Sequence, residues 1–243
     1  FVYWHIISFI LGLCIRKVDV IVSPSPPLSI GMVNLILGWL KGCKVIYNVQ
    51  EIYPDILKKK TGVIIAFLKK VERCIYNKSA AITTIDNVFY NTIVSRFEDP
   101  SKLHIIPNFV DTDLYNPTNA ESLDESLFPQ TDSLKLLYAG NIGHAQDWCP
   151  LVALVERTKE LNVEYFVIGM GVQRQYLEEQ KVEKGLDKLH ILDYQPRHLM
   201  PSILAYSDVQ FIFMAPEMEM MGFPSKVYTI MACERPLLIC SGD

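Results

Sequence analysis

The sequence lacks the features that several protein classes require. It has 23 Lys and Arg against 27 Asp and Glu, so it shows no basic excess of the kind that marks a nucleic-acid-binding protein. Its six cysteines form no Cys-x-x-Cys pair and no Cys/His spacing that suits zinc. We therefore expect no nucleic-acid partner and no metal site, and we interpret the cysteines as reduced, buried thiols of a cytoplasmic protein.

The chain has no apolar run of the length that a bilayer requires. The apolar segment 1–15 is followed by Arg16 and Lys17, whereas a signal peptide carries its positive charge first, and a spanning helix needs about 20 apolar residues. We interpret this segment as an internal helix. Since the chain begins inside it and stops just after the strand-like run 237–240, we expect the chain to be truncated at both ends.

Short β-branched runs alternate with longer amphipathic stretches along the whole chain. This alternation is typical of parallel sheets covered by helices. The predicted strands are 19–23, 44–49, 80–84, 103–107, 134–139, 165–169, 189–192, 209–214 and 237–240, and the predicted helices include 28–40, 63–76, 87–97, 149–161 and 174–184.

A polar segment interrupts this pattern at 116–133, where Asn, Thr, Ser, Asp, Glu and Pro dominate. We interpret it as a linker between a first α/β domain, 1–115, and a second, 134–243. Parallel sheets bind ligands at the carboxyl ends of their strands, so the loops that follow the strands are the places to search for function.

One such loop, Gly140-Asn-Ile-Gly143-His-Ala-Gln-Asp147, lies between a predicted strand and a predicted helix. Glycines allow the backbone to approach a phosphate closely, and free amides with the positive end of a helix dipole attract it. A plain tight turn explains two glycines after a strand equally well, so this loop alone leaves both interpretations open.

A second segment runs Met221-Gly-Phe-Pro-Ser-Lys-Val-Tyr-Thr-Ile-Met-Ala232 and precedes a predicted strand. It resembles the donor-site signature of family 4 glycosyltransferases, in the branch that builds bacterial surface polysaccharides and includes fucosamine transferases. The matching residues are Pro224, Ser225, Lys226, Tyr228, Met231 and Ala232.

Further matches to the same branch occur in order along the chain. The segments 23–27 and 47–55 resemble strand ends that face the substrates, 105–111 resembles the start of the second domain, and 169–171 resembles a later strand-end turn. The resemblance implies a GT-B fold, in which two Rossmann-like domains with parallel sheets face each other across a cleft.

The resemblance also implies an activity. It is that of a retaining glycosyltransferase, a hexosyl- or N-acetylaminosugar transferase, which uses a UDP- or GDP-linked sugar donor without a further cofactor or a metal. The acceptor would be a saccharide or a lipid-linked intermediate of cell-surface glycan synthesis, such as capsule or lipopolysaccharide. We expect the protein in the cytoplasm, with peripheral contact to the inner face of the plasma membrane through the acceptor and the apolar first helix.

Site residues follow from the same resemblance. Gly140 and Gly143 take the positions whose amides face the donor diphosphate, and Asn141 and His144 flank them. Lys226 would stabilise the negative charge that develops on the leaving diphosphate, although a solvated helix lysine is the simpler interpretation. The remaining candidates are Gly222, Phe223, Ser225 and Thr229 on the donor side and Glu51 as a catalytic or polar group on the acceptor side.

The chain departs from the family pattern at two positions that matter. The two donor-site carboxylates of the family fall on Met221 and Thr229. A catalytically degenerate subunit that only binds nucleotide sugars is therefore one alternative, and a sugar-nucleotide epimerase of the same fold is another. Asp111 and Asp113 have a D-x-D form, but they lie away from the predicted donor site and we do not interpret them as metal ligands.

Overall fold

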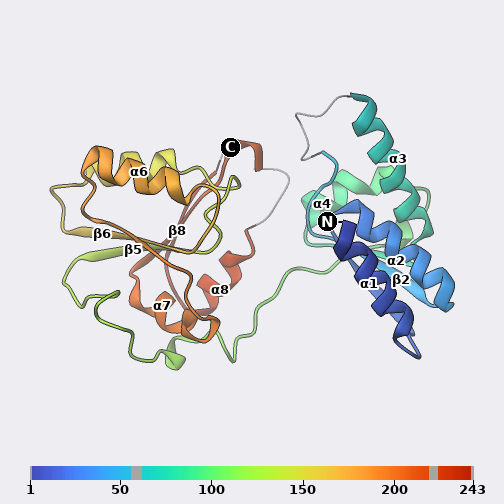
Figure 1. Cartoon of the computed structure of the whole chain (residues 1–243), viewed down its shortest axis with the longest axis horizontal. Helices are drawn as coiled ribbons and strands as arrows, with labels where there is room; N and C mark the ends of the chain where they lie inside the picture. The colour runs from blue at the N-terminus through green and yellow to red at the C-terminus, as the bar shows by residue number, and fades with distance from the viewer. Residues whose placement is uncertain (1, 56–61, 219–223, 242–243) are drawn as a thin grey trace. The chain divides into compact units, whose positions relative to one another are not determined.

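The computed structural model describes residues 2–55, 62–218 and 224–241 and divides the chain into two compact units. One unit extends to Asn108 and the other begins at Phe109. Figure 1 shows that each unit is a sheet with helices packed against it.

The first unit contains a four-stranded parallel sheet in the order β1-β2-β3-β4. Its strands are β1 (Val20–Ser25), β2 (Lys44–Val49), β3 (Ala81–Thr84) and β4 (Leu103–Ile105). Its helices are α1 (Val2–Cys14), α2 (Leu28–Lys41), α3 (Gly62–Lys78) and α4 (Asn87–Ile93). Asp86 caps α4, because its carboxylate accepts a hydrogen bond from the amide of Phe89 at 2.7 Å.

The second unit contains a five-stranded parallel sheet in the order β7-β6-β5-β8-β9. Its strands are β5 (Leu134–Ala139), β6 (Val163–Ile168), β7 (Leu189–Leu192), β8 (Val209–Phe213) and β9 (Leu237–Cys240). Its helices are α5 (Cys149–Arg157), α6 (Arg174–Lys184), α7 (Met200–Tyr206) and α8 (Lys226–Ala232). The strand order places β5 at the centre of the sheet.

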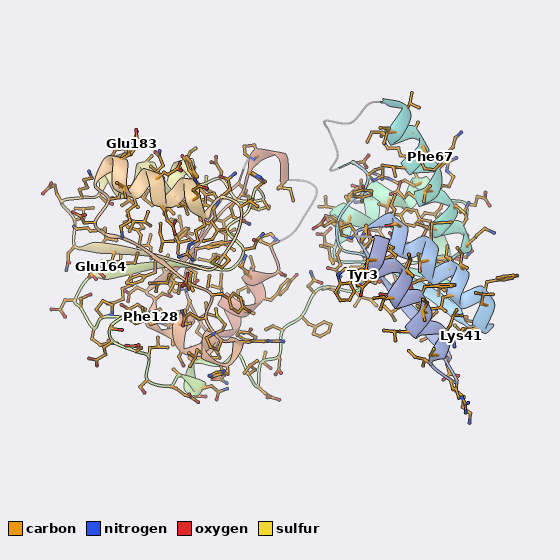
Figure 2. All side chains as sticks on the ribbon, in the orientation of Figure 1. Tyr3, Lys41, Phe67, Phe128, Glu164 and Glu183 are labelled. Carbon is orange, nitrogen blue, oxygen red and sulfur yellow. The ribbon has the colours of Figure 1, made fainter. Side chains whose placement is uncertain are left out.

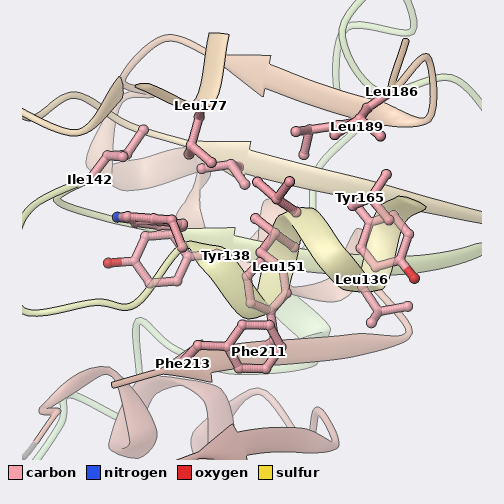
Figure 3. Packing of buried hydrophobic residues seen from close by; sticks show 14 of the residues in the cluster. Leu136, Tyr138, Ile142, Leu151, Tyr165, Leu177, Leu186, Leu189, Phe211 and Phe213 are labelled. Atoms are coloured by element: carbon pink, nitrogen blue, oxygen red, sulfur yellow. The ribbon is translucent and has the colours of Figure 1, made fainter. Parts of the chain in front are cut away.

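Both faces of the second sheet are covered, which explains why its strands are apolar on both sides. Residues of α5 and α6, among them Leu151 and Leu177, pack with Tyr138 on one face, as Figure 3 shows. Ile203 of α7 and Val227 of α8 belong to clusters that also contain residues of the sheet. In Figure 1, α6 lies on one side of the sheet, and α7 and α8 lie on the other.

The elements predicted from the sequence are observed. Strands 44–49, 134–139, 189–192 and 237–240 have the predicted bounds, and the other predicted strands are shifted or shortened by one or two residues. The helix predicted over 87–97 is α4 followed by a 3₁₀ turn, Val94–Arg96, and the helix predicted over 149–161 ends at Arg157. The predicted α/β class with two parallel sheets is confirmed.

The segment 116–133, interpreted above as a linker, is part of the second unit. It contains one short 3₁₀ turn, Pro117–Asn119. Phe128, labelled in Figure 2, is only 1% exposed and stacks on Phe166 with 6.5 Å between ring centroids. Phe128, with Leu123 packed against the same cluster, ties this mostly polar segment to the sheet.

The expectation that the cysteines are buried is wrong for most of them. Cys14, Cys149 and Cys240 are exposed, Cys43 and Cys74 are half-buried, and Cys233 is buried; all six are free thiols. Within the ranges that the structure describes, no helix combines the length and the apolar character needed to cross a bilayer.

Candidate functional site

The carboxyl ends of β5 and β6 meet at a close approach of two backbones. Gly140 and Gly169 have φ angles of +150° and +143°, and the amide of Gly140 donates to the carbonyl of Ile168 at 2.8 Å. A Cβ atom on Gly169 would overlap the carbonyl oxygen of Gly140. Glycine is therefore required at this crossing, both for its φ angle and for its lack of a side chain.

The loop after β5 is held by its carbonyl groups. Tyr138 donates from its hydroxyl to the carbonyl of Asn141 at 2.8 Å, and the indole Nε1 of Trp148 donates to the carbonyl of Gly143 at 3.2 Å. Between them, Ile142 exchanges backbone hydrogen bonds with the loop after β6: its amide donates to Met170 at 2.8 Å and its carbonyl accepts from Gln173 at 2.9 Å. These bonds fix the loop before any ligand is bound.

The backbone amides of the same loop, unlike its carbonyls, are largely without hydrogen-bond partners among the described residues. Within the described part of the chain, the amides of Asn141, Gly143 and His144 have no hydrogen-bond acceptor. Backbone amides that lack a protein partner require water or a ligand, and amides in a fixed glycine loop are suited to an anion. The hydrogen bonds described above therefore hold the loop in place and leave these amides available for a ligand.

Lys226, the first residue of α8, lies next to this loop. A Cβ atom built on Gly140 would overlap Cε and Nζ of Lys226. The ammonium donates to the hydroxyl of Tyr138 at 3.0 Å and lies 4.6 Å from the centroid of its ring. Burial lowers the pKa of Lys226. The simpler interpretation of Lys226, a solvated helix lysine, is therefore wrong, because its cation is partly desolvated beside the glycine loop.

The structure brings together most of the described donor-side candidates. His144 is exposed, and its Nδ1 lies 2.6 Å from Nε2 of Gln173, which follows β6. The side chain of Asn141 is also exposed. Thr229 lines a small cavity together with Tyr138 and Lys226, but its hydroxyl donates to the carbonyl of Lys226 at 2.8 Å and is thus used within α8.

Other predicted residues are placed differently. Ser225 is exposed at the start of α8 and makes no capping hydrogen bond with its side chain. Gly222 and Phe223 lie outside the described residues, as does Met221, one of the two positions where a family carboxylate is missing.

Glu51 belongs to the first unit and follows β2. It is half-buried, and burial raises the pKa of its carboxyl group. Asp55, four residues later, is paired with Lys69 at 2.9 Å and with Arg96. Although burial by itself raises the pKa of Asp55, the bonds from these two cations lower it.

Sequence reasoning missed a pocket at the same edge of the second sheet. It has a volume of about 290 Å³ and touches Gly140 and the ends of β5 and β6. Its polar lining comes from the loop after β7 and includes Tyr194, Gln195 and Arg197. Their position directly after a strand was the available signal, since all parallel strands end at one edge.

Arg174 joins the ends of the neighbouring strands β6 and β7. Its guanidinium donates to the carbonyls of Gly169 at 2.9 Å and Leu192 at 3.3 Å, and it pairs with Asp193 at 2.8 Å. Asp193, which directly follows β7, is therefore an exposed ion-pair partner of Arg174.

The D-x-D segment forms a local turn. One oxygen of Asp111 accepts from the amides of Asp113 at 3.0 Å and Leu114 at 3.1 Å. Over residues 2–55, 62–218 and 224–241, no group of three or more His, Cys, Asp or Glu side chains is arranged to hold a metal ion.

Two curated proteins are similar to this chain over most of its length. A probable glycosyltransferase, WbjE of Pseudomonas aeruginosa, is 22% identical over 229 residues, which cover 92% of this chain and 57% of WbjE. A putative colanic acid biosynthesis glycosyl transferase, WcaI of Escherichia coli K12, is 20% identical and covers 89% of this chain and 56% of WcaI. The chain thus spans about half the length of these relatives. No family model matches the sequence.

Solved structures show the same fold. HepE of Anabaena in complex with UDP-glucose aligns with a TM-score of 0.73 at 14% identity, over 97% of this chain and 62% of HepE. Sucrose-phosphate synthase of Thermosynechococcus elongatus aligns with a TM-score of 0.72 at 14% identity, over 91% of this chain and 55% of that protein. The predicted GT-B fold and the predicted resemblance to glycosyltransferases are confirmed.

Proposed function

We propose that this chain is the larger part of a retaining glycosyltransferase that transfers a sugar from a nucleoside diphosphate sugar to a growing surface polysaccharide or a lipid-linked saccharide. One observation carries the proposal: the free amides of Asn141, Gly143 and His144 lie in one glycine loop, and the partly buried ammonium of Lys226 lies beside that loop. Fixed amides and a desolvated cation are the groups that bind a diphosphate.

The names of the similar proteins support the proposal. WcaI is described as a putative colanic acid biosynthesis enzyme, and HepE has been crystallised with UDP-glucose. For this chain we infer a UDP- or GDP-linked donor and an acceptor hydroxyl of a surface glycan. We also infer a cytoplasmic site of action, with peripheral contact to the inner face of the plasma membrane through a lipid-linked acceptor.

In the proposed reaction the bond between the anomeric carbon of the sugar and the diphosphate oxygen breaks, and the bonding electrons remain on the diphosphate. The acceptor oxygen forms the new bond to the same carbon and gives its proton to the departing diphosphate oxygen. The ammonium of Lys226 would offset the charge that develops on the leaving oxygen, because a fixed cation in a poorly hydrated site stabilises that charge more than the ground state. Glu51 remains the proposed polar group on the acceptor side.

Calorimetry on the chain tests the donor site. We expect Lys226→Ala to weaken the binding of UDP or GDP by roughly 10- to 100-fold, because hydrogen bonds to charged groups contribute about 1.5–3 kcal/mol. Lys181→Ala is the matched control, since it removes a cation from α6 of the same unit and should leave the affinity unchanged. Equal affinities for wild type and Lys226→Ala would contradict the assignment of Lys226 to the donor site.

We propose to test activity on a full-length protein, incubated with UDP- and GDP-sugars with and without saccharide acceptors. Transfer to an acceptor supports the proposal, and inversion at C2 of the sugar without any acceptor would support an epimerase instead. Nucleotide binding without either product would support a degenerate subunit, and gain of transfer by Met221→Glu with Thr229→Glu would then identify the missing carboxylates as the cause.

A further inference from the structure

The buried hydroxyl of Tyr138 connects Lys226 to the glycine loop. Tyr138 lies in β5, is 1% exposed, and donates its single hydroxyl proton to the carbonyl of Asn141 at 2.8 Å. The lone pairs that remain on the same oxygen accept from the ammonium of Lys226 at 3.0 Å. One oxygen therefore contacts both components of the anion site, although Tyr138 and Lys226 are 88 residues apart in the chain.

The ammonium of Lys226 has an uncharged partner. In the described part of the chain, no carboxylate forms an ion pair with it, and its hydrogen bond to Tyr138 is supplemented by the ring of the same residue, whose centroid lies 4.6 Å from Nζ. A partly desolvated cation with a neutral acceptor keeps most of its attraction for an anion. Burial accordingly lowers the pKa of Lys226.

The side chain of Tyr138 is itself fixed. The indole of Trp148 packs edge-on against its ring, with 5.1 Å between centroids and an angle of 88° between the planes. The same indole donates to the carbonyl of Gly143 at 3.2 Å. Burial raises the pKa of Tyr138, so its hydroxyl stays neutral at physiological pH. Tyr138 can therefore serve as a rigid support with a defined direction of donation.

We propose that Tyr138 is a positioning residue, whose hydroxyl holds the ammonium of Lys226 beside Gly140 so that the other N–H groups of the ammonium can donate to a diphosphate. The hydroxyl keeps its own hydrogen bond to the carbonyl of Asn141 when the diphosphate binds, so the glycine loop stays in place. The inference deepens the proposed function and rests on it only where it names the anion as the donor diphosphate.

Tyr138→Phe removes the hydroxyl and keeps the ring and its packing. We expect the titration midpoint of Lys226 to fall by about half to one pH unit, because a hydrogen bond contributes about 0.5–1.5 kcal/mol and 1.36 kcal/mol corresponds to one unit. NMR titration of the chain labelled with ¹³C at the lysine ε position measures this shift, and Lys226→Arg assigns the signal.

Tyr165→Phe is the matched control. Tyr165 lies in the neighbouring strand β6, is 2% exposed in the same core, and its hydroxyl pairs with that of Thr158 at 2.9 Å. Its replacement removes a buried hydroxyl away from Lys226 and should leave the lysine titration unchanged. If Tyr138→Phe moves the midpoint no more than Tyr165→Phe does, the hydroxyl does not hold the ammonium and the inference is wrong.

A double-mutant cycle with UDP tests whether the hydroxyl prepares the ammonium for the diphosphate. We expect Tyr138→Phe to weaken UDP binding by about 3- to 10-fold in the wild-type background and to have little effect in the Lys226→Ala background. A purely structural role, through the carbonyl of Asn141 alone, predicts the same loss in both backgrounds and would overturn the inference. If the wild-type chain binds neither UDP nor GDP, the proposed function fails, while the NMR titration still decides whether Tyr138 holds the ammonium.

Discussion

At the residue scale, position 140 must be glycine for two reasons, and the sequence alone does not show which of them applies. Its φ of +150° excludes residues with a side chain, and the space where a Cβ would lie is filled by Lys226. Many tight turns need a glycine for its φ angle, so the glycine loop alone left the phosphate interpretation open. The second reason is specific to this site.

We expect Gly140→Ala to lower the free energy of unfolding by about 1–3 kcal/mol, because the backbone conformation is nearly restricted to glycine. It should also weaken nucleotide binding, since the new methyl group displaces the ammonium of Lys226. Chemical denaturation and calorimetry measure the two effects.

In the Lys226→Ala background, the cost of the strained backbone at residue 140 can be measured apart from the cost of the steric overlap with Lys226. With Cε and Nζ removed, Gly140→Ala should cost less stability than it does in the wild type, because only the backbone strain remains. An identical loss in both backgrounds would show that Lys226 does not lie over Gly140 in solution.

At the element scale, the loop after β2 is attached to the core by Arg96. Its guanidinium pairs with Asp55 of that loop and with Glu72 of α3, the latter at 3.0 Å. Glu72 is 1% exposed and also accepts from the hydroxyl of Tyr76 at 2.9 Å. Arg96 thus joins a 3₁₀ turn, a helix and the loop that carries Glu51, so it fixes the segment proposed for the acceptor side.

We expect Arg96→Met to destabilise the first unit by about 2–4 kcal/mol, because it leaves the buried carboxylate of Glu72 without its cation. Lys69→Met is the control: Lys69 pairs with the same Asp55, but its side chain is 52% exposed, so its loss should cost less than about 1 kcal/mol. Urea unfolding of both variants gives the comparison, and equal losses would contradict a central role for Arg96.

At the scale of the whole molecule, two carboxylates, the buried Glu72 and the half-buried Asp55, make the free energy of unfolding depend on pH in opposite directions. Burial raises the pKa of Glu72 above its ordinary value of 4.5, against the lowering effect of Arg96 and Tyr76. Its stabilising contribution is therefore present below pH 4.5 and is lost as the pH rises through the folded value. The pKa of Asp55 is lowered, so its contribution is lost as the pH falls below 3.8.

Glu72→Gln isolates the first of these effects, because glutamine still accepts hydrogen bonds from Tyr76 and Arg96 and does not titrate. We expect the free energy of unfolding of the variant minus that of wild type to increase between pH 4 and pH 7, because only wild type loses stability over that range. Denaturation series at several pH values measure this difference, and a difference that stays constant or declines over that range would show that the pKa of Glu72 is not raised in the folded protein.

The sequence by itself determined the elements of both sheets and the order in which they occur. Alternation of β-branched runs with amphipathic stretches is a local property, because the side chains that decide it are only a few residues apart. For that reason the bounds of strands such as 134–139 and 237–240 could be predicted. The same locality allowed the glycine loop and the Pro224-Ser-Lys226 segment to be identified as candidates.

Only the tertiary structure decided where those candidates lie and what they contact. The contact between Lys226 and Tyr138, the use of the Thr229 hydroxyl inside α8, and the pocket lined by Tyr194 and Arg197 arise from the packing of strands and helices that are distant in the chain. No repeating pattern over a few residues of the sequence predicts such contacts. The parallel sheet brings the ends of β5, β6 and β7 to one edge, and that edge, rather than any single motif, assembles the site.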